Sequence, residues 1–413
     1  MKRVVVTGMG ALTPIGNTVE EFLQGLKSGM SGAGPITRFD PSLIRTHFAC
    51  EVKDFDPLDY FNRKEVKRMD PFTIYALKAT QEAMEDANLD LDQLDLTRCG
   101  VIFASGIGGF TTIEHDLRER ERMGRPRYSP FLIPKMISDI AAGYISIKYG
   151  FKGINYATVS ACASSSHAII NAVDYIKLGK AKVIIAGGAE ASVTEAGVGG
   201  FSAMKALSTR NDDPATASRP FDVQRDGFVL GEGAGSLVLE EYEHAKARGA
   251  HIYAEFLGGG MTADAYHITA PHPEGEGAKN VMRFAIEDAG LRPEDVDYVN
   301  VHGTSTPLGD IAEVKAIQAV FGDHAYNLNI SSTKSMTGHL LGAAGAIETI
   351  AGVLATMHDF VPPTINHFER DPALDPNLNF TFNTPQSKPV NVVLNNTFGF
   401  GGHNASIVIK KWS

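Results

Sequence analysis

Cysteine is scarce in this chain of 413 residues, and tryptophan occurs only once. The three cysteines are Cys50, Cys99 and Cys162, an odd number without the paired spacing of a zinc finger. We therefore expect neither a disulfide framework nor a finger-type metal site. The composition favours reduced thiols in a cytoplasmic protein.

Long apolar runs and an excess of positive charge are also missing, and each absence argues against one class of partner. No apolar run approaches the roughly 18 residues that a membrane-spanning helix needs. Glycine interrupts the start, Met1–Gly8, before the apolar core of a signal sequence can form. The formal net charge of −10 argues against nucleic acid as a partner, although it leaves room for a local basic patch.

What the chain does contain is the composition of a large globular protein, with 43% hydrophobic residues, 42 glycines and 21% charged residues. Stretches that read as buried strands alternate with stretches of helical spacing, which is typical of an α/β fold with parallel strands. The pattern begins again near His251. The sequence therefore predicts two similar halves, residues 1–250 and 251–413. Because no Pro- or Ser-rich linker separates them, we expect one compact, pseudo-symmetric unit.

Local patterns predict where the elements lie. Residues 192–213 are rich in glycine, serine and polar residues and are expected to form a long loop. Residues 118–127 are highly charged and are expected to be a surface loop or a helix end. The glycine turn within residues 4–16 lacks the third glycine of a dinucleotide-binding fingerprint, because Thr13 stands there, so we interpret it as a tight turn. The main predicted helices are 20–29, 71–89, 277–290 and 310–321, and the main predicted strands are 99–106, 181–189, 253–259, 297–302, 390–396 and 405–410.

Residues 156–179 combine a short strand, a turn of small residues around Cys162, and a helix that Gly179 is placed to end. Cys162 is thus predicted at the start of a helix. The partial positive charge of a helix N-terminus lowers the pKa of a thiol and favours the thiolate. Free cysteine is also among the most buried residue types. This stretch alone leaves two interpretations open, a nucleophile and a cysteine packed in the core.

Unusual polar or glycine-rich residues follow three other predicted strands. These are His302, the pair Lys334 and His339, and residues 398–402. In α/β sheets, ligands and catalytic groups gather beyond the carboxyl ends of the strands. Small hydroxylated residues follow His302, and His339 lies in a glycine-rich turn, so neither has the apolar surroundings of a core histidine. The pattern therefore predicts a site that these strand ends share.

Four motifs in these stretches resemble the β-ketoacyl synthases of the thiolase superfamily, most closely those of type II fatty acid synthesis. They are TVSACASSSHA at 158–168, VHGTSTPLGD at 301–310, SSTKSMTGHLLGAAGAIE at 331–348 and NTFGFGGHN at 396–404. The resemblance covers essentially the whole chain. It implies a thiolase-like fold, in which two pseudo-symmetric halves form a layered α-β-α-β-α sandwich. One departure is His403, where many relatives carry a threonine.

The resemblance implies a condensing reaction at a Cys-His-His site. Cys162 would take an acyl chain from the thioester of an acyl carrier protein. His302 and His339 would stabilise the enolate that forms when a malonyl group loses CO₂, and this enolate would attack the acyl-cysteine. Backbone N–H groups of Cys162 and Phe400 would form the oxyanion hole, and Phe400 would also act as a gate.

The resemblance implies that two charged residues support this site. Lys334 would tune the electrostatics near His339, and Glu348 would order the polar network. The resemblance implies no metal and no permanently bound cofactor, because the substrates are carried on the phosphopantetheine arm of the acyl carrier protein.

Five further residues are implied to bind the substrate. Ile107 would line the acyl pocket, and Phe201 and Phe398 are further substrate-binding residues. Thr304 and Thr306 would hydrogen-bond the phosphopantetheine arm or the malonyl group, with an ordinary role as turn residues as the alternative.

The implied partner, acyl carrier protein, is small and acidic. An enzyme with a net charge of −10 must dock it through a local basic patch. Lys64, Lys67 and Arg68 would share one face of a helix. The alternative is that this basic face is an ordinary solvated surface without a partner. The resemblance also implies a homodimer. The docking candidates are Lys64, Lys67, Arg68, Arg125, Arg127 and Lys205.

Four alternatives compete with this interpretation. A degradative thiolase would need another cysteine in the second half, and none follows Cys162. A silent partner subunit such as a chain-length factor would lack the nucleophile. A polyketide-type ketosynthase would share the chemistry with other substrates. Zinc bound by Cys162, His302 and His339 would suit the donor types but would occupy the nucleophile.

Overall fold

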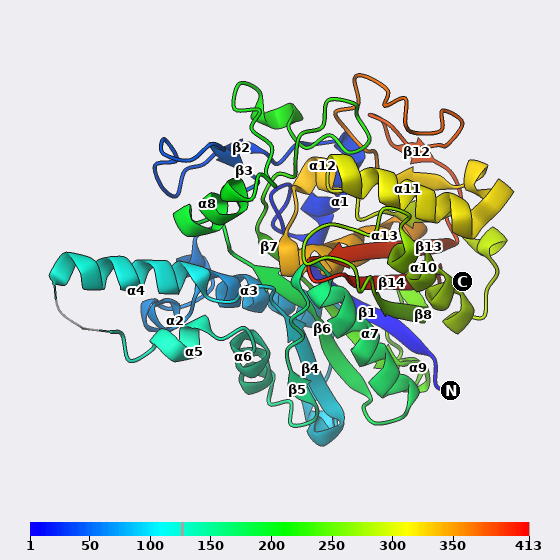
Figure 1. The fold of residues 1–413 in the computed structure, drawn as a ribbon. Helices are drawn as coiled ribbons and strands as arrows, with labels where there is room; N and C mark the ends of the chain where they lie inside the picture. Colours follow the sequence, from blue (N-terminus) through cyan, green and yellow to red (C-terminus); the bar gives the residue numbers. More distant parts are fainter. Residues whose placement is uncertain (125–127, 413) are drawn as a thin grey trace.

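The computed structural model of the chain describes residues 1–124 and 128–412. Its main element is a ten-stranded sheet in the order β10-β9-β13-β14-β8-β1-β7-β6-β4-β5 (Figure 1). Two small antiparallel ribbons, β2 with β3 and β11 with β12, lie apart from it. The strands are β1 (Val4–Leu12), β2 (Gly34–Pro35), β3 (Phe48–Ala49), β4 (Cys99–Ala104), β5 (Asn155–Tyr156), β6 (Val183–Glu190), β7 (Gly233–Glu241), β8 (Ala254–Ala263), β9 (Tyr298–Asn300), β10 (Asn329–Ser331), β11 (Phe360–Val361), β12 (Gln386–Ser387), β13 (Val392–Gly399) and β14 (His403–Lys411).

The two halves of the sheet repeat one topology. The order β5-β4-β6-β7-β1 in the first half corresponds to β10-β9-β13-β14-β8 in the second. In each half, the outer three strands are parallel and the next two pairings are antiparallel. The halves join edge to edge, where Val4–Val6 of β1 pairs with residues 254–256 of β8. The predicted pseudo-symmetric α/β architecture is confirmed.

Helices cover both faces of each half-sheet. The helices are α1 (Val19–Ser28), α2 (Arg63–Arg68), α3 (Pro71–Ala87), α4 (Phe110–Met123), α5 (Leu132–Met136), α6 (Ile140–Tyr149), α7 (Ser164–Lys177), α8 (Glu195–Ala203), α9 (Tyr242–Ala247), α10 (Glu276–Asp288), α11 (Pro307–Phe321), α12 (Lys334–Thr337) and α13 (Ala344–His358). Helix α7 packs on β4 and β6, and α13 packs on β13, β14 and β7. Helices α3 and α6 cover the first half, and α10 covers β8 and β14 with α11 beside it.

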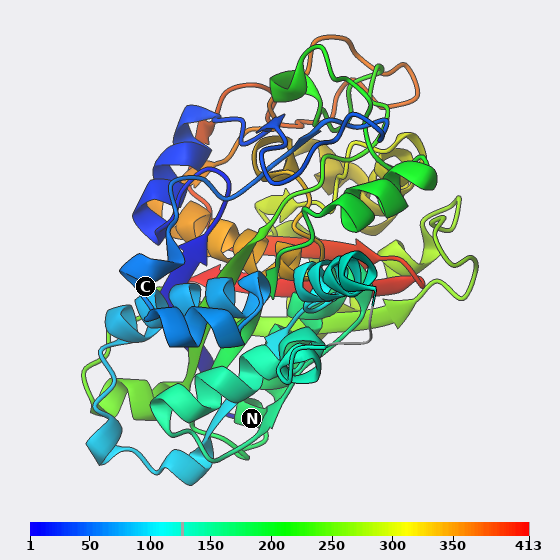
Figure 2. The ribbon, with the colours of Figure 1, turned by 90° about the vertical axis from the view of Figure 1, so that its left-hand side faces the viewer.

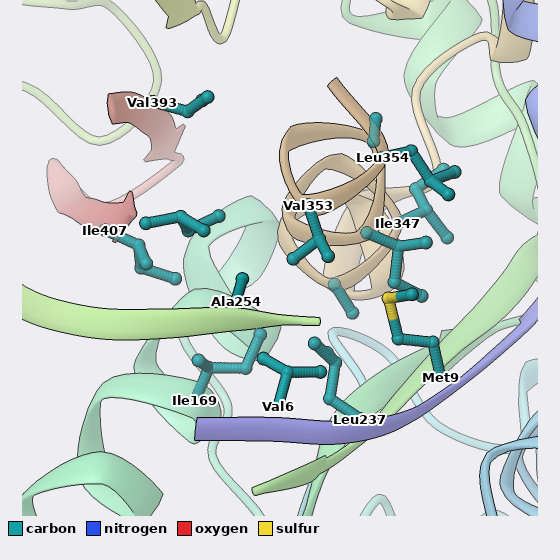
Figure 3. Close-up of a cluster of buried hydrophobic side chains, with 14 of the residues drawn as sticks. Val6, Met9, Ile169, Leu237, Ala254, Ile347, Val353, Leu354, Val393 and Ile407 are labelled. Carbon is teal, nitrogen blue, oxygen red and sulfur yellow. The ribbon is translucent and has the colours of Figure 1, made fainter. Parts of the chain in front are cut away.

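Alternating side chains show that these helices lie on opposite faces of the strands. Along β6, Val183 and Ile185 belong to the core under α3 and α6, whereas Ile184 and Ala186 belong to the core that includes α7 and α13. The latter core receives side chains from strands of both halves (Figure 3). Helices α7 and α13 therefore form the middle of five layers.

Close packing in this middle layer depends on one glycine. A Cβ atom added to Gly345 of α13 would lie 2.0 Å from Ser166 Oγ of α7.

The segment Leu341–His358 has the length and apolarity of a membrane span, contrary to our expectation that no run reaches this length. Because 89% of it is buried inside the fold, its apolar character is explained by its place between the half-sheets.

The structure corrects one predicted loop and shows a helix end where a surface loop or a helix end was predicted. Residues 192–213 contain helix α8, which Thr194 caps by accepting a hydrogen bond from Gly197 N. Residues 118–123 belong to the last turns of α4, a regular helix that projects from the body in Figure 1 and is seen end-on in Figure 2. The helix after Cys162 ends as predicted, and Gly179 adopts a left-handed conformation with φ +70°.

Candidate functional site

A cavity of about 560 Å³ lies where strand ends of both halves meet. It brings together most of the residues that the sequence predicts. Lys334 and Glu348 do not line it and are buried behind it. The predicted residues along its wall are Ile107, Cys162, Phe201, Lys205, His302, Thr304, Thr306, His339, Phe398 and Phe400.

Cys162 lies in the middle of a tight turn, Ala161–Ala163, directly before α7. Ala161 has φ +51°, a left-handed conformation that non-glycine residues seldom adopt. Ser164 holds this turn, because its Oγ donates to Ala161 O at 2.7 Å and accepts from Ser160 N at 2.8 Å. The turn presents Cys162 to the cavity with 8% of its surface exposed.

Burial outweighs the backbone N–H groups at the start of the helix, which lower the pKa of Cys162 as predicted. Burial raises the pKa of the Cys162 thiol to about 12, and the positive charge of Lys334 and the backbone N–H groups of Phe400 and Cys162 offset this only in part. Removing a thiolate from water costs more than the helix terminus returns. The thiol therefore needs a base within reach to react.

His339 provides such a group. Its Nε2 lies 2.9 Å from Cys162 Sγ. The backbone of His339 is held like a strand residue, donating to Val229 O at 2.8 Å and accepting from Gly231 N at 2.9 Å. Burial, with Lys334 nearby, holds the pKa of His339 well below its usual range, so the ring is neutral.

His302 completes a three-residue cluster. Its ring centre lies 5.2 Å from that of His339, and the two planes are nearly perpendicular. Burial, Lys334 and His339 hold the pKa of His302 well below its usual range. One donor atom from each of Cys162, His302 and His339 lies within 4.8 Å of the other two. Such a set fits zinc by donor type and spacing, and it also fits a thiol flanked by two neutral imidazole rings.

A carboxylate that the sequence analysis missed holds His302. Glu313 of α11 accepts from His302 N at 2.9 Å and from Gly303 N at 2.8 Å. Burial raises the pKa of Glu313 to about 7. A signal for it exists in the sequence, because Asp310 and Glu313 stand on the same helical stripe as the buried Ile317 and Phe321.

Lys334 and Glu348 form the predicted polar pair behind the histidines. They make an ion pair with each other, and both are almost fully buried. Burial raises the pKa of Glu348 to about 7 against the opposing effect of Lys334. A buried charge without such a partner is costly, so Glu348 keeps the cation in place beside the site.

The glycine-rich loop after β13 approaches the cysteine turn closely. A Cβ added to Gly399 would lie 3.1 Å from Cys162 N and 2.8 Å from Ser160 O. The backbone N–H groups of Phe400 and Cys162 both favour negative charge at the sulfur. This placement suits two donors that stabilise an oxyanion beside Cys162.

Thr304 and Thr306 present their hydroxyl groups side by side, with 3.1 Å between the two Oγ1 atoms. Between them, the buried Ser305 has φ +68°, which turns both threonines to one side. Arg225 holds this loop by donating hydrogen bonds to Thr306 O at 3.4 Å and to Pro307 O at 3.1 Å. The sequence analysis did not identify this residue.

The structure describes four of the six basic docking candidates. Lys64, Lys67 and Arg68 lie on the exposed surface of α2, away from the cavity wall. Lys205 is exposed at the cavity itself. Arg125 and Arg127 lie outside the described residues.

Comparison with known proteins identifies the family of the chain. Residues 1–245 match the family described as "Beta-ketoacyl synthase, N-terminal domain", and residues 253–368 match "Beta-ketoacyl synthase, C-terminal domain". The chain is 51% identical to 3-oxoacyl-acyl-carrier-protein synthase 2 of Synechocystis, over 100% of this chain and 98% of that protein. It is 50% identical to the protein of the same name from Staphylococcus aureus, over 100% of this chain and 99% of that protein.

Solved structures extend the likeness to the fold. A β-ketoacyl synthase from Burkholderia phymatum is 37% identical with a TM-score of 0.91, and the match covers 100% of both chains. The ishigamide ketosynthase/chain length factor is 36% identical with a TM-score of 0.93, also over 100% of both chains. These neighbours confirm the predicted thiolase-like fold. The chain belongs to the β-ketoacyl synthase family.

Proposed function

We propose that this enzyme condenses an acyl chain, carried by acyl carrier protein, with malonyl-acyl carrier protein in type II fatty acid synthesis. The products are 3-oxoacyl-acyl carrier protein, CO₂ and free acyl carrier protein. The observation that carries the proposal is the 2.9 Å approach of His339 Nε2 to Cys162 Sγ at the wall of the cavity that His302 also lines. The names of relatives at about 50% identity support the fatty acid pathway over a polyketide pathway.

In the first step, the acyl chain moves to Cys162. His339 is neutral and takes the thiol proton as the sulfur attacks the thioester carbonyl. The carbonyl oxygen gains negative charge and accepts hydrogen bonds from Cys162 N and Phe400 N. The carbonyl then re-forms, the acyl–sulfur bond to the carrier breaks, and the leaving thiolate receives the proton.

In the second step, malonyl-acyl carrier protein binds and loses CO₂. The electron pair of the broken bond becomes an enolate, whose oxygen accepts hydrogen bonds from ring N–H groups of His302 and His339. Once Cys162 is acylated, His339 no longer has to accept the thiol proton, and the tautomer with its proton on Nε2 makes this hydrogen bond. Because both rings have a depressed pKa, they donate as neutral groups and do not protonate the carbanion before it reacts. The carbanion attacks the acyl carbonyl, the bond between the acyl carbon and the sulfur breaks, and the departing Cys162 thiolate takes up a proton from water, which restores the resting thiol.

The cavity supports roles for the substrate-binding residues. Ile107 and Phe201 belong to one apolar cluster, which suits the acyl chain. Thr304 and Thr306 would hydrogen-bond the phosphopantetheine arm or the malonyl group. The ring centre of Phe398 lies 5.8 Å from that of His302. Phe400 would move as a gate when Cys162 is acylated.

We also propose that acyl carrier protein docks on the basic side chains of α2 and on Lys205 at the cavity. Lys64, Lys67 and Arg68 on α2 and Lys205 at the cavity supply the charge that an acidic partner needs. Arg125 and Arg127 remain candidates by sequence. A solved complex of a type II polyketide acyl-carrier protein with its ketosynthase, 35% identical to this chain with a TM-score of 0.91, supports this class of partner.

We further propose that the enzyme acts in the cytoplasm as a homodimer of two whole chains. Each chain consists of the halves 1–250 and 251–413. The family matches end and begin close to that boundary. Strand β5 lies at the outer edge of the sheet. Exposed apolar side chains lie close to it along the chain, with Ile147 80% and Val159 60% exposed, as expected of a surface that a second copy covers.

Replacing Cys162 by Ala is expected to lower condensation by at least about three orders of magnitude, because the covalent intermediate cannot form. Release of CO₂ from malonyl-acyl carrier protein should persist, since both histidines remain, and should disappear when His302 is also replaced. Product analysis with radiolabelled malonyl substrate measures both. Retained condensation in Cys162→Ala would refute the nucleophile, and stoichiometric zinc in the purified enzyme would refute the covalent mechanism.

Reversing the charge of Lys64 and Lys67 to Glu is expected to raise the KM for acyl carrier protein by about tenfold at low salt. The effect should shrink at about 0.5 M salt, where charges are screened over a few Å. Lys246→Glu with Lys410→Glu is the matched control, because both lysines are exposed and belong neither to α2 nor to the cavity wall. An equal rise in both double variants would reject the docking surface.

Light scattering is expected to give twice the chain mass of 44.4 kDa. Ile147→Glu should convert the dimer to a monomer, because the charge would be buried in the interface. Leu43→Glu, at a residue that is 95% exposed elsewhere, is the control and should leave the mass unchanged. A monomeric unmodified enzyme would contradict the proposed assembly.

A further inference from the structure

Glu190 is a fully buried carboxylate at the end of β6 that the proposed mechanism does not use. It accepts hydrogen bonds from five groups, all of them neutral. The donors are Ser105 Oγ (3.1 Å), Gly106 N (2.8 Å), Ile107 N (3.2 Å), Ser192 Oγ (3.3 Å) and Gly342 N (3.0 Å). A buried carboxylate that is matched only by neutral donors is costly, and burial raises its pKa. Such a cost suggests a role beyond packing.

The carboxylate joins two loops that build the site, next to the cysteine turn. Gly106 and Ile107 form the turn after β4 that reaches the acyl pocket. Gly342 follows His339 in the turn before α13. The space between them is full, because a Cβ added to Gly106 would lie 2.8 Å from Glu190 Oε2 and 3.4 Å from Ala161 O of the cysteine turn.

The pseudo-symmetry of the fold explains why a carboxylate fits there. The turn Leu341–Ala343 before α13 matches the turn Ala161–Ala163 before α7, and their first residues share a left-handed φ of +46° and +51°. Gly342 thus occupies the position in the second half that Cys162 occupies in the first. In the first half, the N–H of this position faces the reacting sulfur. In the second half, the equivalent N–H of Gly342 donates to Glu190.

We infer that Glu190 is a positioning residue, whose carboxylate permanently fills the anion-binding turn of the second half and thereby holds the acyl-pocket turn and the His339 turn against the cysteine turn. This inference rests on the proposed function for its effect on turnover. Its charge also disfavours the thiolate of Cys162, whereas Lys334 favours it. Glu190 therefore sets both the shape of the acyl pocket and the charge balance at the sulfur.

The test compares Glu190→Ala, Glu190→Gln and Glu190→Asp with Glu195→Gln, a control at a half-exposed carboxylate of α8. Loss of the acceptor leaves several buried N–H groups unpaired, so Glu190→Ala should lose about ten- to a hundredfold in kcat/KM. The KM for long acyl-acyl carrier proteins should rise more than the KM for malonyl-acyl carrier protein, because the Ile107 turn loosens. Glu190→Asp, which keeps the charge, should retain more activity than Glu190→Gln.

Chemical rescue separates an anion site from simple packing. Formate should restore part of the activity of Glu190→Ala, whereas formamide, which has a similar size but no charge, should not. Equal rescue by both, or rescue by neither, would overturn the inference. If Glu190→Ala does not fold, the comparison of Glu190→Gln with Glu190→Asp decides.

Alkylation of Cys162 by iodoacetamide needs no acyl carrier protein, so it tests Glu190 independently of the proposed reaction. Without the negative charge, Glu190→Gln should reach a given alkylation rate at a lower pH than the unmodified enzyme, and Glu195→Gln should not. An unchanged pH profile would overturn the inference. Absence of condensation in the unmodified enzyme would instead refute the proposed function and leave this readout valid.

Discussion

The site depends on one contact between the two halves of the chain, in which His339 Nε2 lies 2.9 Å from Cys162 Sγ. Cys162 comes from the turn before α7, and His339 comes from the turn before α13. The middle layer brings these two helices together, and Gly345 allows their close approach. The five-layered fold is therefore what places a base beside a nucleophile that lies far from it in sequence.

Burial sets the charge state of this contact. It raises the pKa of the Cys162 thiol and lowers the pKa of both histidines, so the resting site holds a thiol and two neutral rings. Lys334 is the positive charge that acts on all three groups, and its buried partner Glu348 holds it there. A neutral resting site avoids the cost of a buried thiolate and creates charge only when a substrate carbonyl can accept it.

Much of this arrangement could be predicted from the sequence, because the informative signals are local. The small residues around Cys162, the helical spacing after it and Gly179 predicted a cysteine at the start of a helix, and the strand ends predicted which residues would meet it. The sign of the pKa shift could not be predicted, because burial is a property of the assembled fold. Helix α8 was missed because its glycines and small polar residues resemble a loop, and packing of buried residues such as Val198 in the fold stabilises it.

Residues that act through long-range hydrogen bonds were also beyond reach. Glu313 and Glu190 bind backbone N–H groups of other segments, and a backbone donor leaves no mark in the sequence. Their one local signal is an acidic residue within an apolar pattern. Such a residue indicates that a buried carboxylate has partners, but it does not say which ones.

The measurement that tests the account most directly is the mass of the peptide that contains Cys162 after the enzyme is mixed with acyl-acyl carrier protein alone. The account predicts that this peptide gains the mass of the acyl group, that the adduct is absent from Cys50 and Cys99, and that malonyl-acyl carrier protein then removes it. An enzyme that elongates acyl chains without a Cys162 adduct, or with the chain on another residue, would contradict it.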